Sequence, residues 1–332
     1  MTQGGIELVC PAGSPAMLRA AIEAGADSVY CGLRDETNAR NFPGLNFSEQ
    51  ELAEAARWTR ARGRRLMVAV NTFARAGGVE PWRRAVDVVA RSGVHAMIAA
   101  DLGVLAYARE RYPELRLHLS VQAAAGTPEA IRFYAEAFGV RRAVLPRVLT
   151  VQEIAALGRE VQVETEAFVF GGLCVMAEGR CALSSYATGR SPNLSGVCSP
   201  PEAVSFTERG GRLTPRLSGF ALDSFEPGAP AGYPTLCKGR FDADGVLSHM
   251  FEEPVSLNAM SLLAGLRGAG VTAVKVEGRQ RGKVYVARVA AAFRQAIDAL
   301  DRGQDTRPYE ALLLDLTEGG RETAGAYRKG WR

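Results

Sequence analysis

The sequence predicts a (β/α)8 barrel of the TIM type that carries a cysteine-bearing insert after its seventh strand. Two observations support this fold class. Short apolar runs alternate with helical segments eight times along the chain, and residues 171–255, after the seventh run, lack this rhythm. Without that insert roughly 250 residues remain, which is the usual size of such a barrel. A doubly wound open sheet is the alternative, but no G-x-G-x-x-G motif follows the first strand.

Each predicted unit consists of a strand, a turn and a helix. The first strand is closed by Pro-Ala-Gly, after which Ser14 and Pro15 begin a helix. The later strands are equally short and apolar, as expected for a parallel sheet covered on both faces. The predicted strands are residues 6–10, 28–31, 66–70, 96–99, 117–120, 143–145, 163–170 and 273–276. The predicted helices are residues 14–24, 48–62, 81–92, 103–112, 128–138, 151–159, 256–267 and 283–302.

This pattern divides the chain into four parts. Residues 1–170 form the barrel units through strand 7, and residues 171–255 form the iron-sulfur insert whose cysteines are described below. Residues 256–302 supply strand 8 and the last barrel helices, and residues 303–332 are a C-terminal tail.

Composition places the chain among ordinary globular proteins. Apolar residues make up 47% and charged residues 23%, which argues against disorder and against a coiled coil. The net charge of +4 is spread along the chain, so we expect no nucleic-acid partner. We find no signal peptide and no apolar run of the ~20 residues that a spanning helix needs. The sequence therefore predicts a soluble, cytoplasmic protein without a transmembrane segment.

Polar and reactive side chains gather where the predicted strands end. Barrel enzymes place their chemistry at the carboxyl ends of the strands, and the insert would hang over that mouth. Single residues there often serve only as hydrogen-bond partners, and we interpret Cys10 and Cys31 as small buried groups. His118, within strand 5, is interpreted as a packed core residue. The residues at the strand ends are Cys10, Cys31, Asn71, Asp101, Ser120, Gln122, Arg147, Glu166, Lys275 and Glu277.

Four of the six cysteines, Cys174, Cys181, Cys198 and Cys237, fall in the insert with the spacing C-x6-C-x16-C-x38-C. Structural zinc sites usually present thiolates in closely spaced pairs, which this spacing does not match. Singly placed thiolates on loops suit a 4Fe-4S cluster better, while zinc and free thiols remain alternatives. The nearby Arg180, Arg190 and Lys238 would offset the thiolate charge, or would be ordinary loop charges.

The segment from Glu166 to Ser184, together with Val274 to Arg279, resembles the collagenase-like peptidase family U32. Within that family, residues 168–174, 184–189 and 196–200 are most similar to a branch that works in oxygen-independent ubiquinone biosynthesis. The resemblance covers nearly the whole chain. It implies that the four insert cysteines hold a 4Fe-4S cluster and that the chain hydroxylates the ring of a prenylated phenol without oxygen. It also implies a heterodimer with a related subunit, and we expect a lipid-carrying accessory protein to deliver the substrate.

Hydroxylation without oxygen needs an oxygen atom from water or from an organic donor, and related proteins are linked to prephenate. A dicarboxylate donor would need cationic clamps at the mouth. We assign this role to Arg147, Lys275 and Arg279, with Glu277 holding an arginine or moving a proton; a charged rim network is the alternative.

Other functions compete with this hypothesis. Relatives in the family hydroxylate RNA bases, and a cluster-bearing subunit could transfer electrons without catalysing the reaction. Proteolysis is disfavoured, because the chain has three histidines and neither an H-E-x-x-H nor a G-x-S-x-G motif.

Overall fold

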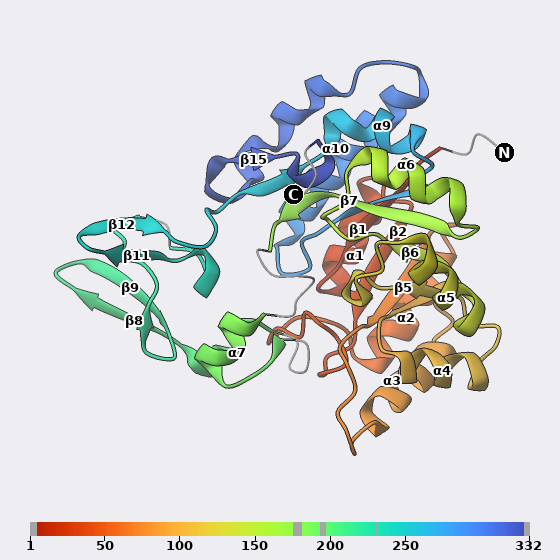
Figure 1. The fold of residues 1–332 in the computed structure, drawn as a ribbon, viewed down its shortest axis with the longest axis horizontal. Helices are drawn as coiled ribbons and strands as arrows, with labels where there is room; N and C mark the ends of the chain where they lie inside the picture. Colours follow the sequence, from red (N-terminus) through yellow and green to blue (C-terminus); the bar gives the residue numbers. More distant parts are fainter. Residues whose placement is uncertain (1–4, 175–180, 193–196, 230, 329–332) are drawn as a thin grey trace.

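The computed structural model describes residues 5–174, 181–192, 197–229 and 231–328, and it shows a closed parallel barrel wrapped by helices (Figure 1). Strands β1 to β7 pair in chain order, and β14 pairs with both β1 and β7, which closes the ring. The predicted eight-stranded barrel is confirmed. Its strands are β1 Glu7–Pro11, β2 Ser28–Gly32, β3 Arg65–Val70, β4 Ala96–Ala99, β5 Leu117–Leu119, β6 Val140–Val144, β7 Glu164–Gly172 and β14 Ala273–Val276.

Helices cover the outer face of the barrel, and side-chain caps fix where several of them begin. Ser48 and Glu51 form a reciprocal capping box at the start of α2, as Thr150 and Glu153 do at α6. None of the helices among the described residues is both long and apolar enough to cross a bilayer. The barrel helices are α1 Pro15–Glu23, α2 Glu49–Arg60, α3 Glu80–Arg91, α4 Leu102–Arg111, α5 Pro128–Phe138, α6 Val151–Glu160, α9 Leu263–Gly268 and α10 Lys283–Asp301.

One predicted helix, residues 256–267, is wrong in its first half. The structure has a strand there, β13 Ser256–Asn258, before a 3-10 turn and the short helix α9. Strand β13 pairs antiparallel with the end of β7, where Ser256 lies opposite Gly172. Strand β7 extends past the rim of the barrel. There β13 pairs with the end of β7 as the chain returns from the insert.

The insert leaves the barrel at the carboxyl end of β7 and returns to it at β13. It projects to one side as α7 Ala182–Thr188 and two groups of antiparallel strands (Figure 1). Because it departs from and rejoins the same end of the same strand, it lies on the side of the mouth, as predicted. Its strands are β8 Val204–Arg209, β9 Arg212–Leu217, β10 Phe220–Ala221, β11 Arg240–Ala243 and β12 Val246–His249.

The segment after α10, which the sequence predicted only as a C-terminal tail, packs against the barrel. A 3-10 helix, Arg307–Leu316, follows α10, and β15 Glu322–Thr323 pairs with β13. The buried Tyr327 donates a hydrogen bond from Oη to the carbonyl of Phe168 at 2.6 Å. This last segment therefore braces β7, the strand from which the insert departs.

The barrel interior holds a chain of ion pairs among apolar side chains. Arg142, which is 4% exposed, contacts the carboxylates of Glu7 at 2.6 Å, Glu164 at 2.7 Å and Glu166 at 3.0 Å. The second oxygen of Glu166 accepts from Lys275 Nζ at 2.6 Å. Charged groups survive in such an interior only when each is paired and hydrogen-bonded. These pairs join β1, β6, β7 and β14 across the barrel.

Replacing Arg142 tests how much the barrel depends on this chain. Arg142→Met removes the cation that three carboxylates share. The free energy of unfolding, measured in urea, should therefore fall by about 3–5 kcal/mol. Arg288→Met is the matched control, because it breaks an exposed pair with Asp315 on the surface and should leave the midpoint nearly unchanged. Equal midpoints for the two variants would contradict the assignment.

Candidate functional site

The carboxylate of Glu277 joins three loops at the mouth of the barrel. Glu277 directly follows β14, and its Oε1 accepts from Arg40 Nη2 at 2.8 Å. Its Oε2 accepts from Arg147 Nη2 at 2.5 Å. Arg40 lies in the loop after β2, and Arg147 lies in the loop after β6. Burial alone would raise the pKa of Glu277, but the charges of Arg147 and Arg40 outweigh it and lower the pKa to about 2.

A glycine makes this bridge possible. Gly171 has φ +127°, and a Cβ at this position would lie 2.7 Å from the Cβ of Glu277 and 3.0 Å from its carbonyl oxygen. Any larger residue would push β7 away from Glu277. The sequence places Gly171 just before Cys174, but its visible role here is to admit Glu277.

Arg279, two residues further along, is the most deeply buried cation of the mouth. It is 6% exposed, and its Nη1 donates to Asn38 Oδ1 at 2.6 Å. Its guanidinium lies 5.4 Å from the ring centre of Tyr30. Burial lowers the pKa of Arg279 to about 10. No carboxylate among the described residues lies within 4.0 Å of it.

Lys275 lies below the mouth rather than in it. Its Nζ contacts Glu166 at 2.6 Å and lies 3.7 Å from the ring centre of Tyr30. Phe168 is a second ring at this level, with the Arg147 guanidinium 3.6 Å from its centre. We call Tyr30 and Phe168 the aromatic layer. Burial lowers the pKa of Lys275, while the Glu166 carboxylate opposes that shift. The structure therefore gives Lys275 the position of a support beneath the layer.

The predicted strand-end residues fall into two groups. Asn71 and Ser120 bond to one another at 3.3 Å. Cys10 and Cys31 are fully buried, and burial raises the pKa of both thiols, to about 12 for Cys31. His118 is buried as predicted and accepts from Arg116 at 3.0 Å through Nε2. These groups serve the packing of the barrel, whereas Arg147, Glu277 and Arg279 share the mouth.

Sequence reasoning missed Arg40, Asn38 and Tyr30. Tyr30 lies within β2, and its Oη donates to the carbonyl of Val276 at 3.0 Å. The other two residues belong to the polar loop that follows this strand. The length of that loop and its many amides and charges were a usable signal, because it follows a barrel strand at the catalytic end.

The four insert cysteines come from four separate segments around one region. Cys181 caps α7, where its sulfur accepts from the backbone N–H of Ser184 at 3.3 Å. The Ser184 hydroxyl in turn donates to the carbonyl of Cys198. Burial and the charges of Cys174 and Cys198 raise the pKa of the Cys237 thiol to about 12. These interactions bring together the cysteines that the sequence singled out.

Four thiols on four segments form the donor set that a cubane cluster takes, with one thiolate to each iron. Among the residues that the structure describes, no three His, Cys, Asp or Glu side chains converge on one ion-sized point. A cubane spreads its ligands further apart than a single ion does. The residues present therefore fit a 4Fe-4S group in number and chemistry, and Cys174, Cys181, Cys198 and Cys237 would hold it.

The cations predicted to offset the cluster charge are already paired. Arg190 forms an ion pair with Glu202, and Lys238 forms one with Glu318. Arg180 lies outside the described residues. Arg40 is a further cation in this region: burial lowers the pKa of its guanidinium, the carboxylate of Glu277 outweighs burial and raises it, and Cys198 and Cys174 add to that rise.

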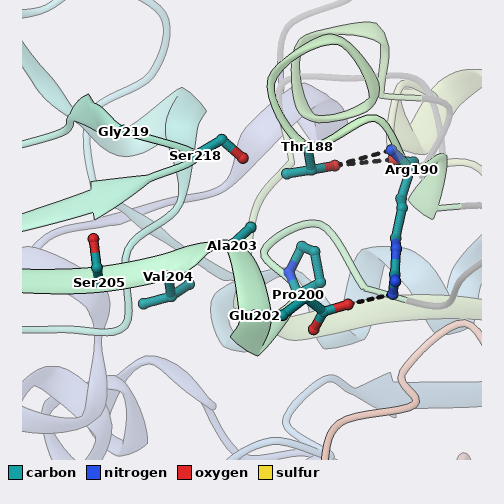
Figure 2. A pocket seen from close by; sticks show the side chains of 9 residues that line it. All are labelled: Thr188, Arg190, Pro200, Glu202, Ala203, Val204, Ser205, Ser218 and Gly219. Atoms are coloured by element: carbon teal, nitrogen blue, oxygen red, sulfur yellow. Dashed lines mark hydrogen bonds and ion pairs between the residues drawn. The ribbon is translucent and has the colours of Figure 1, made fainter.

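The insert also has an open polar pocket of about 450 Å³, shown in Figure 2. The Arg190–Glu202 ion pair crosses one side of it, and Thr188 and Ser218 lie on the other parts of its wall. None of the residues predicted to act in catalysis or to bind the cluster lines this pocket. We therefore place the candidate site at the barrel mouth instead.

Comparison with known proteins now decides the family, because the model of peptidase family U32 matches residues 13–326. The chain belongs to this family. It is 30% identical to the tRNA hydroxylation protein P of Escherichia coli, over 94% of this chain and 72% of that protein. It is 29% identical to the Collagenase of Porphyromonas gingivalis, over 91% of this chain and 68% of that one. It is also 29% identical to the 23S rRNA 5-hydroxycytidine C2501 synthase of Escherichia coli, over 91% of this chain and 41% of that one.

The family name and the names of these relatives point in different directions. Two of the three relatives are named for hydroxylation and one for proteolysis. The mouth of this chain offers guanidinium groups, a carboxylate held between two of them, and aromatic rings. These groups can bind and orient an anionic or planar molecule. They therefore agree with a hydroxylase-like role, which the names of two of the relatives indicate.

The Glu277 bridge predicts a specific dependence of stability on pH. The folded pKa of about 2 lies below the ordinary value of 4.5, so the bridge stabilises the fold fully above pH 4.5. This contribution should fade as the pH falls from about 4.5 towards 2. Glu277→Gln should therefore lower the unfolding temperature at pH 7, and the difference from the unaltered chain should shrink between pH 4.5 and 3. A difference that stays constant over this range would contradict the low pKa.

Proposed function

We propose that this chain is the iron-sulfur subunit of an oxygen-independent hydroxylase that acts on the aromatic ring of prenylated ubiquinone precursors. In this proposal it corresponds to UbiU and works as a heterodimer with a UbiV-like subunit. The observation that carries the proposal is the position of Arg40. Its guanidinium bonds to Glu277 at 2.8 Å and also lies within the electrostatic reach of Cys198 and Cys174. Cys174 also follows Gly171, the residue beside Glu277, by three positions, which supports our placing of the predicted cluster ligands next to the mouth.

A bound 4Fe-4S cluster supplies single-electron transfer. The residues of the chain do the rest by binding and orientation. The aromatic layer of Tyr30 and Phe168 forms the floor of the mouth, and cations lie against its rings. The positive charge of the guanidinium groups above it would attract the donor of the new oxygen atom, which is either an organic acid such as prephenate or water held beside such an acid. The bridge through Glu277 keeps Arg147 and Arg40 at fixed positions, so the site is organised before the substrate arrives.

The four residues predicted to be catalytic receive different roles in this proposal. Arg147 and Arg279 face the mouth, and their positive charge attracts the donor. Glu277 acts as the holder of arginines, one of the two roles expected for it. Lys275 acts indirectly, because its Nζ is turned towards Glu166 and supports the Tyr30 ring from below. A lysine in this position orders the layer and makes no contact with the donor.

The lipid tail of the substrate calls for partners. A polyprenyl chain exposed to water is strongly unfavourable, so we propose that a lipid-carrying protein, UbiT-like in role, delivers the prenylated phenol to the heterodimer. The apolar side chains exposed on the insert include Phe206, Phe220 and Phe251, each about half exposed. They are a suitable place to look for either partner.

A second candidate function is RNA-base hydroxylation, which the names of the relatives favour. A pyrimidine base is a planar ring, and the guanidinium planes at the mouth could accept it by stacking. We rank this candidate second, because the net charge of +4 is dispersed and phosphate contacts need a concentrated basic face. A cluster subunit that only passes electrons to its partner is a third candidate.

Gene deletion distinguishes these functions. Without oxygen, the deletion strain should lose ubiquinone and accumulate prenylphenol intermediates, whereas aerobic ubiquinone should be unchanged, as measured in lipid extracts. Persistence of anaerobic ubiquinone together with loss of a hydroxylated nucleoside would replace this proposal with the RNA function. Loss of ubiquinone under both conditions would point to a role in assembling the pathway.

The cluster itself is tested on the protein purified without air. It should be brown and carry about four irons and four sulfides per chain. Cys198→Ala should lose most of this iron, because one of four ligands is gone. Cys31→Ala is the matched control, since that thiol is fully buried within the barrel wall and should leave iron content unchanged. The opposite pattern would show that the ligand assignment is wrong.

A further inference from the structure

Among the described residues, the barrel mouth carries more guanidinium groups than carboxylates. Arg40, Arg147 and Arg279 contribute three guanidinium groups, and Glu277 contributes one carboxylate. Both oxygens of that carboxylate are used, one by Arg40 at 2.8 Å and one by Arg147 at 2.5 Å. The deeper lysine, Lys275, is matched by Glu166. Among the described residues, Arg279 is thus the mouth cation that lacks a carboxylate within 4.0 Å.

Its burial makes this lack significant. Arg279 is only 6% exposed, and a charged group buried without a counter-ion is strongly unfavourable. An anion that reaches the guanidinium therefore gains more there than at a solvated arginine. Solvent does reach the neighbouring groups, since the side chains of Arg40 and Glu277 are 32% and 22% exposed.

Asn38 determines what kind of anion fits. Its amide oxygen accepts from Arg279 Nη1 at 2.6 Å and so occupies one of the five N–H donors of the guanidinium. The side chain of Asn38 is itself anchored, because its amide nitrogen donates to the carbonyl of Leu33 at 3.1 Å. Arg279 is therefore held in one orientation by a neutral partner, and among the described residues Asn38 is the one acceptor found for its guanidinium. One free edge of a guanidinium matches the two oxygens of a carboxylate.

We propose that Asn38 and Arg279 form the carboxylate-binding element of the barrel mouth, and that the Arg40–Glu277–Arg147 bridge is a closed support rather than a clamp. The ligand class is a small molecule with a carboxylate, bound above the ring of Tyr30. This inference deepens the proposed function by naming the residue pair and the group they recognise. It adds Asn38, and it separates the role of Arg279 from that of Arg147.

Calorimetric titration of the full chain, purified without oxygen, tests the proposal with three probes. Succinate represents an aliphatic acid, benzoate represents an aromatic acid, and inorganic phosphate represents an anion of different shape. We expect binding of at least one carboxylate, and which one binds tells an aliphatic donor from an aromatic substrate acid. Tighter binding of phosphate than of either carboxylate, or no binding of any probe, would overturn the proposal. Neither result would bear on the lipid measurements that test the proposed function.

Three variants locate the binding. Arg279→Gln should weaken it roughly ten- to a hundredfold, the loss expected for a charge-assisted hydrogen bond. Asn38→Asp should also weaken binding while keeping the arginine. The carboxylate at position 38 would pair with Arg279 and neutralise the charge that attracts the ligand. A cooperative unfolding transition retained in that variant shows that its loss of binding is not misfolding. Arg281→Gln is the matched control, since this neighbouring arginine pairs with Glu318 and is 40% exposed, and it should bind normally. Unchanged binding in Asn38→Asp would overturn the proposal.

Discussion

The arrangement of the mouth depends on one carboxylate held between two guanidinium groups. Glu277 follows β14, yet its partners come from the loops after β2 and β6, so a single side chain ties together three separate parts of the barrel rim. Burial alone would raise the pKa of Glu277 and favour its neutral form. The positive charges of Arg147 and Arg40 outweigh burial and keep the carboxylate ionised. Arg40 and Arg147 are thereby committed to the bridge, which leaves the buried Arg279 without a carboxylate partner among the described residues.

In the barrel interior below the mouth, buried charges are likewise neutralised by partners of opposite sign. Arg142, Glu166 and Lys275 form a chain in which each charge has a partner of opposite sign. The aromatic layer of Tyr30 and Phe168 separates this chain from the mouth, and cations lie against its rings from both levels. Charges below the layer are paired within the protein, whereas above it the described residues include more guanidinium groups than carboxylates. The layer is therefore the boundary between structural and functional charge.

The fold was predictable from the sequence because barrel strands buried on both faces are short apolar runs with helices between them. The exception at residues 256–258 follows from a tertiary contact, since β13 forms only because β7 extends past the rim. The site was predictable in part. Arg147, Glu277 and Arg279 were found because each closely follows a strand. Strand alternation shows that Lys275 points inward, but its depth relative to Tyr30 depends on the whole ring of strands. Arg40 and Asn38 were missed because loop residues have no periodic pattern.

The position of the insert gives the cysteines a consequence beyond holding a metal group. The insert leaves the end of β7 beside Gly171, which itself contacts Glu277, so the path from the first cysteine to the bridge is only a few residues long. Arg40 closes the same path through space, because it bonds to Glu277 and lies in the field of Cys174 and Cys198. In the proposed function, a charged group held by these cysteines would therefore act on the mouth through Arg40, the arginine that Glu277 connects to Arg147.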